Sequence, residues 1–172
     1  MALADEFYYP KLNLSPYILV PFPMAKILNI RLETTVDGNY KDVMARFDKS
    51  LFEALKPKYG KMEVLEFTGS ETGDIVRLKF HTPMKADWVS HIVDHGTDKN
   101  QAYFIDEGTI LPFPLTYWRH KHIVEKIDNN RSIIIDDMTF SAGNIFFTLL
   151  MYPALYLAFY PRKKIYKRYF RQ

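Results

Sequence analysis

The sequence predicts a single α+β domain, in which a curved antiparallel sheet of seven strands packs against a long C-terminal helix, with two short helices at one end. Three observations predict this arrangement. Seven strand-like runs are separated by short turn-forming stretches. Two short helical patterns follow the first of these runs. A long apolar segment of helical character closes the chain, and 172 residues suit one hydrophobic core.

Composition limits the classes of function. The chain has no cysteine, which excludes disulfides, thiolate catalysis and cysteine-based metal sites. Its net charge of +3 is too small to predict nucleic-acid binding. Asp5 and Glu6 stand where a signal peptide would carry basic residues, so we expect a cytoplasmic protein.

The first 25 residues are expected to form an extended arm, and the domain is placed at residues 26–172. Prolines at positions 10, 16, 21 and 23 exclude a regular helix or a central strand. The same stretch is too rich in aromatic and aliphatic residues for a disordered tail. We therefore expect the arm to pack on the domain or across a homodimer.

The predicted domain begins with a strand at residues 26–36, ended by an Asp-Gly turn. Asn39 can cap a first short helix, and Ser50 with Glu53 can form the capping box of a second. Six further strands follow. Their expected ranges are 62–68, 74–81, 85–95, 101–108, 116–127 and 131–140. The short connections between these strands imply an antiparallel meander.

A closing helix is predicted from about residue 143 to residue 170, with Pro153 and Pro161 as candidate breaks. Its apolar run, residues 145–160, is shorter than the ~20 residues of a membrane span, so we expect a core helix. The end of the helix, residues 162–171, is basic and aromatic. Such a pattern is typical of a solvated helix end, and peripheral contact with anionic lipid stays open as the alternative.

The most informative pattern lies in the predicted strand at residues 116–127. Side chains alternate along a strand, so Trp118, His120 and His122 share one face, and charged residues occupy the other. We expect the tryptophan and histidine face to point inward. Buried histidines are usually satisfied core residues. The alternatives here are the orientation of a polar ligand group or metal binding.

A metal would need a third ligand besides the His-x-His pair. His91 and His95 lie two strands away, a spacing that permits a shared site but does not predict one. We therefore predict no metal and no cofactor.

Asp136 is the candidate partner of His122. A three-residue loop at positions 128–130 places these two residues opposite each other. A two-residue loop would shift the register by one and bring Asp137 to the inner face instead. The remaining alternative is that both aspartates face solvent.

No catalytic residue is predicted. The sequence has neither a G-x-S-x-G nucleophile elbow nor a glycine-rich phosphate loop. An enzyme would have to use His120 or His122 as a general acid or base, with Tyr103 or Tyr117 as a hydrogen-bond donor.

The element order is that of a helix-grip fold, and the residues along it resemble the START/SRPBCC superfamily, in particular its bacterial, polyketide cyclase-like members related to birch-pollen allergens. The resemblance covers residues 26–171. It is carried by residues 51–57, Trp88 with Ile92, Phe104-Ile105-Asp106-Glu107, Pro112-Phe113, Trp118-x-His120-x-His122 and Asp136-x-Met138-x-Phe140. Leu111 departs from the glycine that the family usually places before the Pro-Phe pair.

The resemblance implies a cavity for a hydrophobic or amphipathic small molecule, such as a lipid, an isoprenoid or a polyketide, between the sheet and the closing helix. The alternative is a cyclase/aromatase-like or hydrolase-like enzyme that uses His120 or His122 in the same cavity. The residues expected to contact the ligand are Trp118, His120, His122, Asp136, Trp88, Ile92, Phe104 and Phe113.

Overall fold

The computed structural model describes residues 26–57, 61–82 and 84–171. The prediction made for residues 1–25 lies outside this part of the chain. The strands are β1 (Leu28–Asp37), β2 (Met62–Phe67), β3 (Ile75–Phe80), β4 (Ala86–Thr97), β5 (Gln101–Ile110), β6 (Leu115–Lys126) and β7 (Arg131–Ala142). The helices are α1 (Tyr40–Ala45), α2 (Lys49–Ala54), α3 (Ile145–Phe159) and α4 (Arg162–Tyr169).

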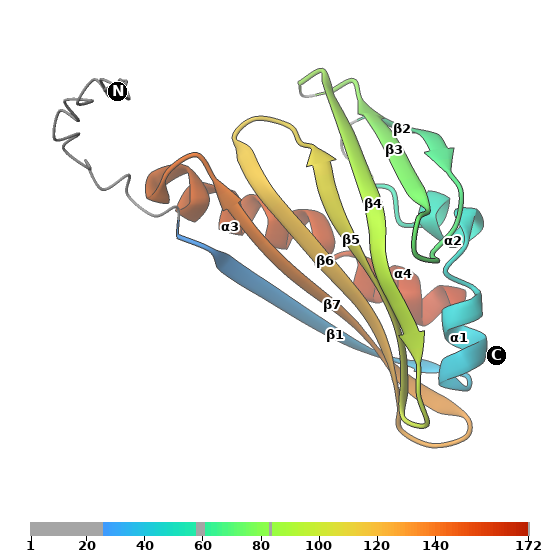
Figure 1. The fold of residues 1–172 in the computed structure, drawn as a ribbon. Coiled ribbons are helices and arrows are strands. Elements are labelled where there is room, and N and C mark those ends of the chain that lie inside the picture. Colours follow the sequence, from blue (N-terminus) through green and yellow to red (C-terminus); the bar gives the residue numbers. More distant parts are fainter. Residues whose placement is uncertain (1–25, 58–60, 83, 172) are drawn as a thin grey trace, which may run out of the picture.

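The seven strands form one antiparallel sheet, as the sequence predicted, and their order is β1-β7-β6-β5-β4-β3-β2 (Figure 1). Six strands follow one another as a meander, and β1 joins the far edge beside β7. The turn between β6 and β7 has the three-residue register, because the Ile127 amide donates to the carbonyl of Arg131 at 3.1 Å. That register places Asp136 opposite His122.

The two short helices begin at polar caps. The Asn39 side chain accepts a hydrogen bond from the amide of Lys41 and caps α1, as predicted. For α2 the prediction was wrong, because Asp48 is the cap, and its carboxylate accepts from the amide of Leu51. The helix therefore begins earlier than the Ser50 capping box would place it.

The closing helical segment consists of α3 and α4, which lie on the inner side of the sheet (Figure 1). The break falls at Tyr160 and Pro161, whereas Pro153 stays inside α3. Proline has no amide hydrogen, so Pro161 cannot continue the hydrogen-bond ladder of α3. In the described ranges, no helix combines the length and the apolar character needed to cross a bilayer.

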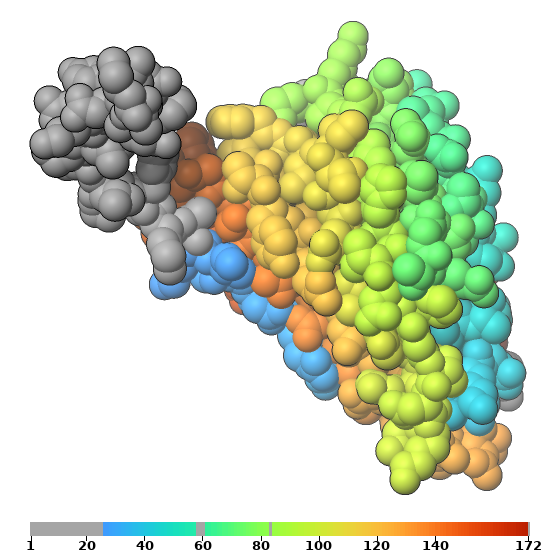
Figure 2. Space-filling view, viewed as in Figure 1, coloured from blue at the N-terminus to red at the C-terminus, as the bar shows by residue number. Residues whose placement is uncertain are grey.

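The hydrophobic core is divided into two clusters on the inner face of the sheet. One joins the short helices and α4 to the sheet, and includes Phe47, Leu51, Phe104 and Tyr166. The other lies under α3 and includes Trp118, Phe140 and Leu155. In the space-filling view of Figure 2 the strands cover most of α3 and α4, so this face of the molecule is the outer side of the sheet. The candidate site lies between the two clusters.

Candidate functional site

The inner face of β6 carries the side chains that the sequence singled out. Trp118, His120 and His122 are 2%, 3% and 7% exposed, whereas Arg119 and Lys121 between them are only half-buried. The prediction that the tryptophan and histidine face points inward is confirmed. Strand alternation places the three rings in one row, directed toward the helices.

The two histidines interact with two aspartates in a crossed pattern. The His120 Nε2 atom lies 3.1 Å from Asp136 Oδ1, and His122 Nε2 lies 3.1 Å from Asp106 Oδ2. The strand register instead places Asp136 opposite His122 and Asp106 opposite His120. Between the residues that face each other directly the distances are longer, at 3.6 Å from His122 Nδ1 to Asp136 Oδ1 and 3.6 Å from His120 Nδ1 to Asp106 Oδ2.

Two further donors orient the carboxylates. The Trp118 indole Nε1 donates to Asp106 Oδ1 at 3.1 Å, and the Tyr166 hydroxyl of α4 donates to Asp136 Oδ1 at 3.3 Å. Sequence reasoning missed Asp106 as a site residue, although it follows Ala102 and Phe104 on the inward face of β5 and strand alternation could have identified it. No local pattern could have paired Tyr166 with Asp136.

Burial and charge shift the proton affinities of this cluster. Burial lowers the pKa of His122 to about 4, and the neighbouring His120 acts in the same direction, against the attraction of Asp106. Burial alone would raise the pKa of Asp136, but the hydrogen bond from His120 and the positive charges of His120 and Arg162 lower it to about 2. The pKa of Asp106 is also lowered, because its hydrogen bond with His122 and the nearby histidine charge outweigh burial.

The pKa of Tyr166 is raised well above its usual value by burial and by the charge of Asp136, so its phenol keeps its proton. At neutral pH the cluster therefore combines two carboxylates with a neutral His122.

Aromatic rings hold the histidines in place. Phe104 stacks on His122 with ring centres 4.2 Å apart, and Phe159 of α3 meets His120 edge-on at 5.4 Å. Trp88 of β4 packs edge-on against Trp118 at 5.0 Å. The polar cluster thus has apolar neighbours on several sides, which strengthens its internal electrostatic interactions.

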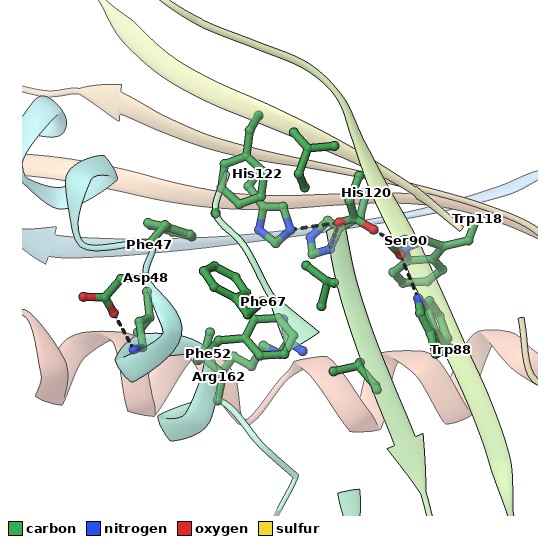
Figure 3. Close-up of a pocket in the computed structure, with 18 of the residues that line it drawn as sticks. Phe47, Asp48, Phe52, Phe67, Trp88, Ser90, Trp118, His120, His122 and Arg162 are labelled. Atoms are coloured by element: carbon green, nitrogen blue, oxygen red, sulfur yellow. Dashed lines mark hydrogen bonds and ion pairs between the residues drawn. The ribbon is translucent and has the colours of Figure 1, made fainter. Parts of the chain in front are cut away.

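Two neighbouring cavities open beside the cluster. The smaller has a volume of about 80 Å³ and is lined by Asp106, His120 and His122, together with apolar residues of α2 and β4 (Figure 3). The larger has about 310 Å³ and lies between α3 and the β2–β4 part of the sheet. The cavities share the side chains of Phe52, Leu78, Trp88, Phe159 and Arg162 as lining residues.

Arg162, at the start of α4, is the cation between these cavities. Its guanidinium lies 3.9 Å above the ring centre of Phe159, and its buried Nε atom has no hydrogen-bond partner. None of the ion pairs between described residues includes Arg162. The sequence analysis placed this residue only in a solvated basic helix end. Pro161 was a candidate break, but the direction of the chain after the break depends on tertiary packing.

The other predicted site residues are distributed unevenly. Ile92 and Phe104 line the smaller cavity, and Trp88 lines both. Phe113 is among the lining residues of the larger cavity but is 73% exposed. Asp136 lines neither cavity, because the histidines lie between it and the open space.

Residues considered for other kinds of chemistry lie elsewhere. Tyr103 and Tyr117 line neither cavity, and the hydroxyl of Tyr103 donates to Asp94 in an exposed position. An enzyme using either tyrosine as its donor is therefore not supported. His95 interacts with Thr72 rather than with the histidine cluster.

Comparison with known proteins gives a fold but no sequence family. No family model matches the chain, and no curated protein matches it.

Solved structures do match. The Zhui aromatase/cyclase from Streptomyces sp. R1128 superposes with a TM-score of 0.60 at 13% identity, covering 81% of this chain and 91% of that one. A point mutant of norcoclaurine synthase from Thalictrum flavum gives 0.60 at 15% identity, covering 83% and 93%. A hypothetical protein from Helicobacter pylori gives 0.57 at 14% identity, covering 99% of each chain.

At identities this low, the superpositions show a shared fold and give no information on a ligand or an activity. The superpositions cover most of the curved seven-stranded sheet and the helices of this chain. The chain has the helix-grip fold.

Proposed function

We propose that the protein holds an amphipathic small molecule, with its apolar body in the larger cavity and its polar end toward Arg162 and the histidine cluster. The observation that carries this proposal is the pair of neighbouring cavities, one apolar and one with a polar wall, that share Arg162. Ligand sites are typically apolar clefts with a few placed polar groups.

The larger cavity suits a hydrophobic body. Its lining side chains are almost all aliphatic or aromatic, with Leu78, Trp88 and Leu155 among them. Small-molecule sites enclose roughly 300–1,000 Å³, and the volume of about 310 Å³ is at the lower end of that range. This size favours a single acyl or prenyl chain, or a small ring system, over a large lipid.

The polar end of the ligand is best matched by an acidic group. The buried Nε atom of Arg162 lacks a hydrogen-bond partner, and a carboxylate or phosphate oxygen of the ligand would supply the missing acceptor. We therefore propose an acidic amphiphile rather than a neutral one. The two neighbouring carboxylates are already hydrogen-bonded to the histidines, whereas Arg162 Nε has no such partner.

Two measurements test the proposal. Native mass spectrometry of protein purified from its own host should show a co-purifying small molecule. Titration with medium-chain fatty acids should change tryptophan fluorescence, because the chain has two tryptophans and both line a cavity. If no amphiphile binds saturably and the purified protein carries no small molecule, the proposal is wrong.

A further inference from the structure

We propose that Asp106, His120 and His122 form a binding site for one divalent transition-metal ion of the Zn²⁺, Fe²⁺ or Co²⁺ kind, open to the smaller cavity. This inference goes beyond the holding of a small molecule and does not depend on it.

The donor atoms are spaced as such an ion requires. Asp106 Oδ2 lies 3.1 Å from His122 Nε2 and 3.6 Å from His120 Nδ1. One ligand atom from each of the three residues falls within 4.8 Å of the other two. A tetrahedral ion with bonds of about 2.1 Å separates its ligand atoms by about 3.4 Å. Small side-chain rotations therefore bring the three atoms to bonding distance.

Hydrogen-bond counting favours an ion at this position. All four imidazole nitrogens of His120 and His122 face a carboxylate oxygen at 3.1–3.6 Å. Imidazoles that bind a metal are neutral, and two neutral imidazoles have only two N–H groups, so in that state two lone pairs must face carboxylate oxygens. If both N–H groups point toward Asp136, both lone pairs converge beside Asp106. A cation there would replace two repulsive contacts, between imidazole lone pairs and Asp106, by metal–ligand bonds. It would also fix the proton of His122 on Nδ1, which has no hydrogen-bond partner.

The surrounding residues resemble the outer shell of a metal site. Histidine ligands usually donate their second nitrogen to a carboxylate, and Asp136 is placed to accept from both rings. The Trp118 indole holds Asp106 by Oδ1, so Oδ2 is the oxygen that faces the two histidines. Tyr166 in turn donates to Asp136 and fixes its orientation.

The site would keep an open coordination position. Closed structural zinc sites use four protein ligands, whereas three ligands leave room for water or a substrate atom. All three ligands line the cavity of about 80 Å³, which supplies both the open position and the route of entry. Two histidines with one carboxylate, in a chain without cysteine, suit Zn²⁺, Fe²⁺ or Co²⁺.

The test uses the untagged full chain, stripped with a chelator and dialysed against Co²⁺. We expect one Co²⁺ per chain by elemental analysis, with the intense visible absorption of a four-coordinate ion. Asp106→Asn should abolish this binding, because it removes the anionic ligand while its amide oxygen can still accept from Trp118. Asp136→Asn keeps the ligands and should weaken binding about 10- to 100-fold.

Replacement of the other three histidines, at positions 81, 91 and 95, by alanine is the matched control and should leave binding unchanged. Proton NMR of the Co²⁺-loaded parent protein gives a readout that does not depend on the folding of any variant, because paramagnetically shifted imidazole signals must come from His120 and His122. Absence of stoichiometric binding by the parent, unchanged binding in Asp106→Asn, or shifted signals from the other histidines would each overturn the proposal.

Discussion

His120 is hydrogen-bonded to Asp136, with its Nε2 atom 3.1 Å from Oδ1, although the register of β6 and β7 places His122 opposite that carboxylate. The same diagonal relation recurs between His122 and Asp106 on the other side of β6. Each imidazole is therefore hydrogen-bonded to an aspartate that lies one inward-facing position away from the residue directly opposite. The two crossed pairs connect β5, β6 and β7 beside the smaller cavity.

Asp136→Ala should strongly destabilise the protein, whereas Asp137→Ala should not. Removal of the buried Asp136 carboxylate leaves His120 and Tyr166 without their acceptor, and loss of one partner from a buried charged pair costs about 3–5 kcal/mol. Asp137 points outward and pairs with Arg31, which is worth at most about 1 kcal/mol. Urea unfolding of both variants measures the difference. Equal losses would mean that Asp136 does not support the cluster.

The free energy of unfolding of the metal-free protein should fall as the pH is lowered from about 6.5 to about 4. Burial lowers the pKa of His122 to about 4 in the folded protein. As the pH falls, this histidine is therefore protonated in the unfolded chain before it is protonated in the folded one, so stability rises with pH across the window. The contribution is on the order of 3 kcal/mol. His122→Gln should flatten this part of the profile, and His95→Gln should keep the slope of the parent protein.

Below pH 4 a second loss of stability is expected from Asp136. The pKa of its carboxyl is lowered to about 2 in the folded protein, so its contribution is present above the ordinary carboxyl range and disappears as the pH falls toward 2. Acid unfolding followed by circular dichroism should therefore become less steep below pH 4 in Asp136→Asn. A profile identical to that of the parent would contradict this assignment.

Arg162→Gln should lower the affinity for a fatty acid by about tenfold or more and leave the affinity for the alcohol of equal chain length unchanged. A charge-assisted hydrogen bond between the guanidinium and a carboxylate contributes about 1.5–3 kcal/mol, and a neutral alcohol does not form it. Tryptophan fluorescence titration measures both ligands. Lys163→Gln, on the adjacent residue that lines neither cavity, is the control and should behave like the parent protein. Equal losses for acid and alcohol would refute a charge-specific role.

Ala158→Phe should block the larger cavity. The Ala158 side chain lines this cavity, and a phenyl group there would occupy space assigned to the ligand body. We expect binding of any amphiphile to be lost while the melting temperature changes little, because Ala158 is exposed. Leu157→Phe adds a similar group one residue away, at an exposed position outside the cavity, and should bind normally. Normal binding by Ala158→Phe would place the ligand elsewhere.

The sequence by itself determined the strands, their antiparallel order and the inward face of β6. Strand alternation is a local property, so Trp118, His120 and His122 had to share a face. The loop at residues 128–130 left Asp136 and Asp137 as alternatives, and the structure supplied the register that selects Asp136. The resemblance to the START/SRPBCC superfamily rested on residues in this same order, and the superpositions bear out the fold.

Only the tertiary structure decided which groups meet and where space remains. Strand register placed Asp136 opposite His122, but the side-chain torsions of both histidines produced the diagonal pairs. Tyr166 lies 30 residues from Asp136 in sequence, and Arg162 reaches the cavities only because the helix breaks at Pro161. Local patterns determine which face a side chain occupies. Contacts between distant elements depend on how their helices and strands pack, which no short stretch of sequence specifies.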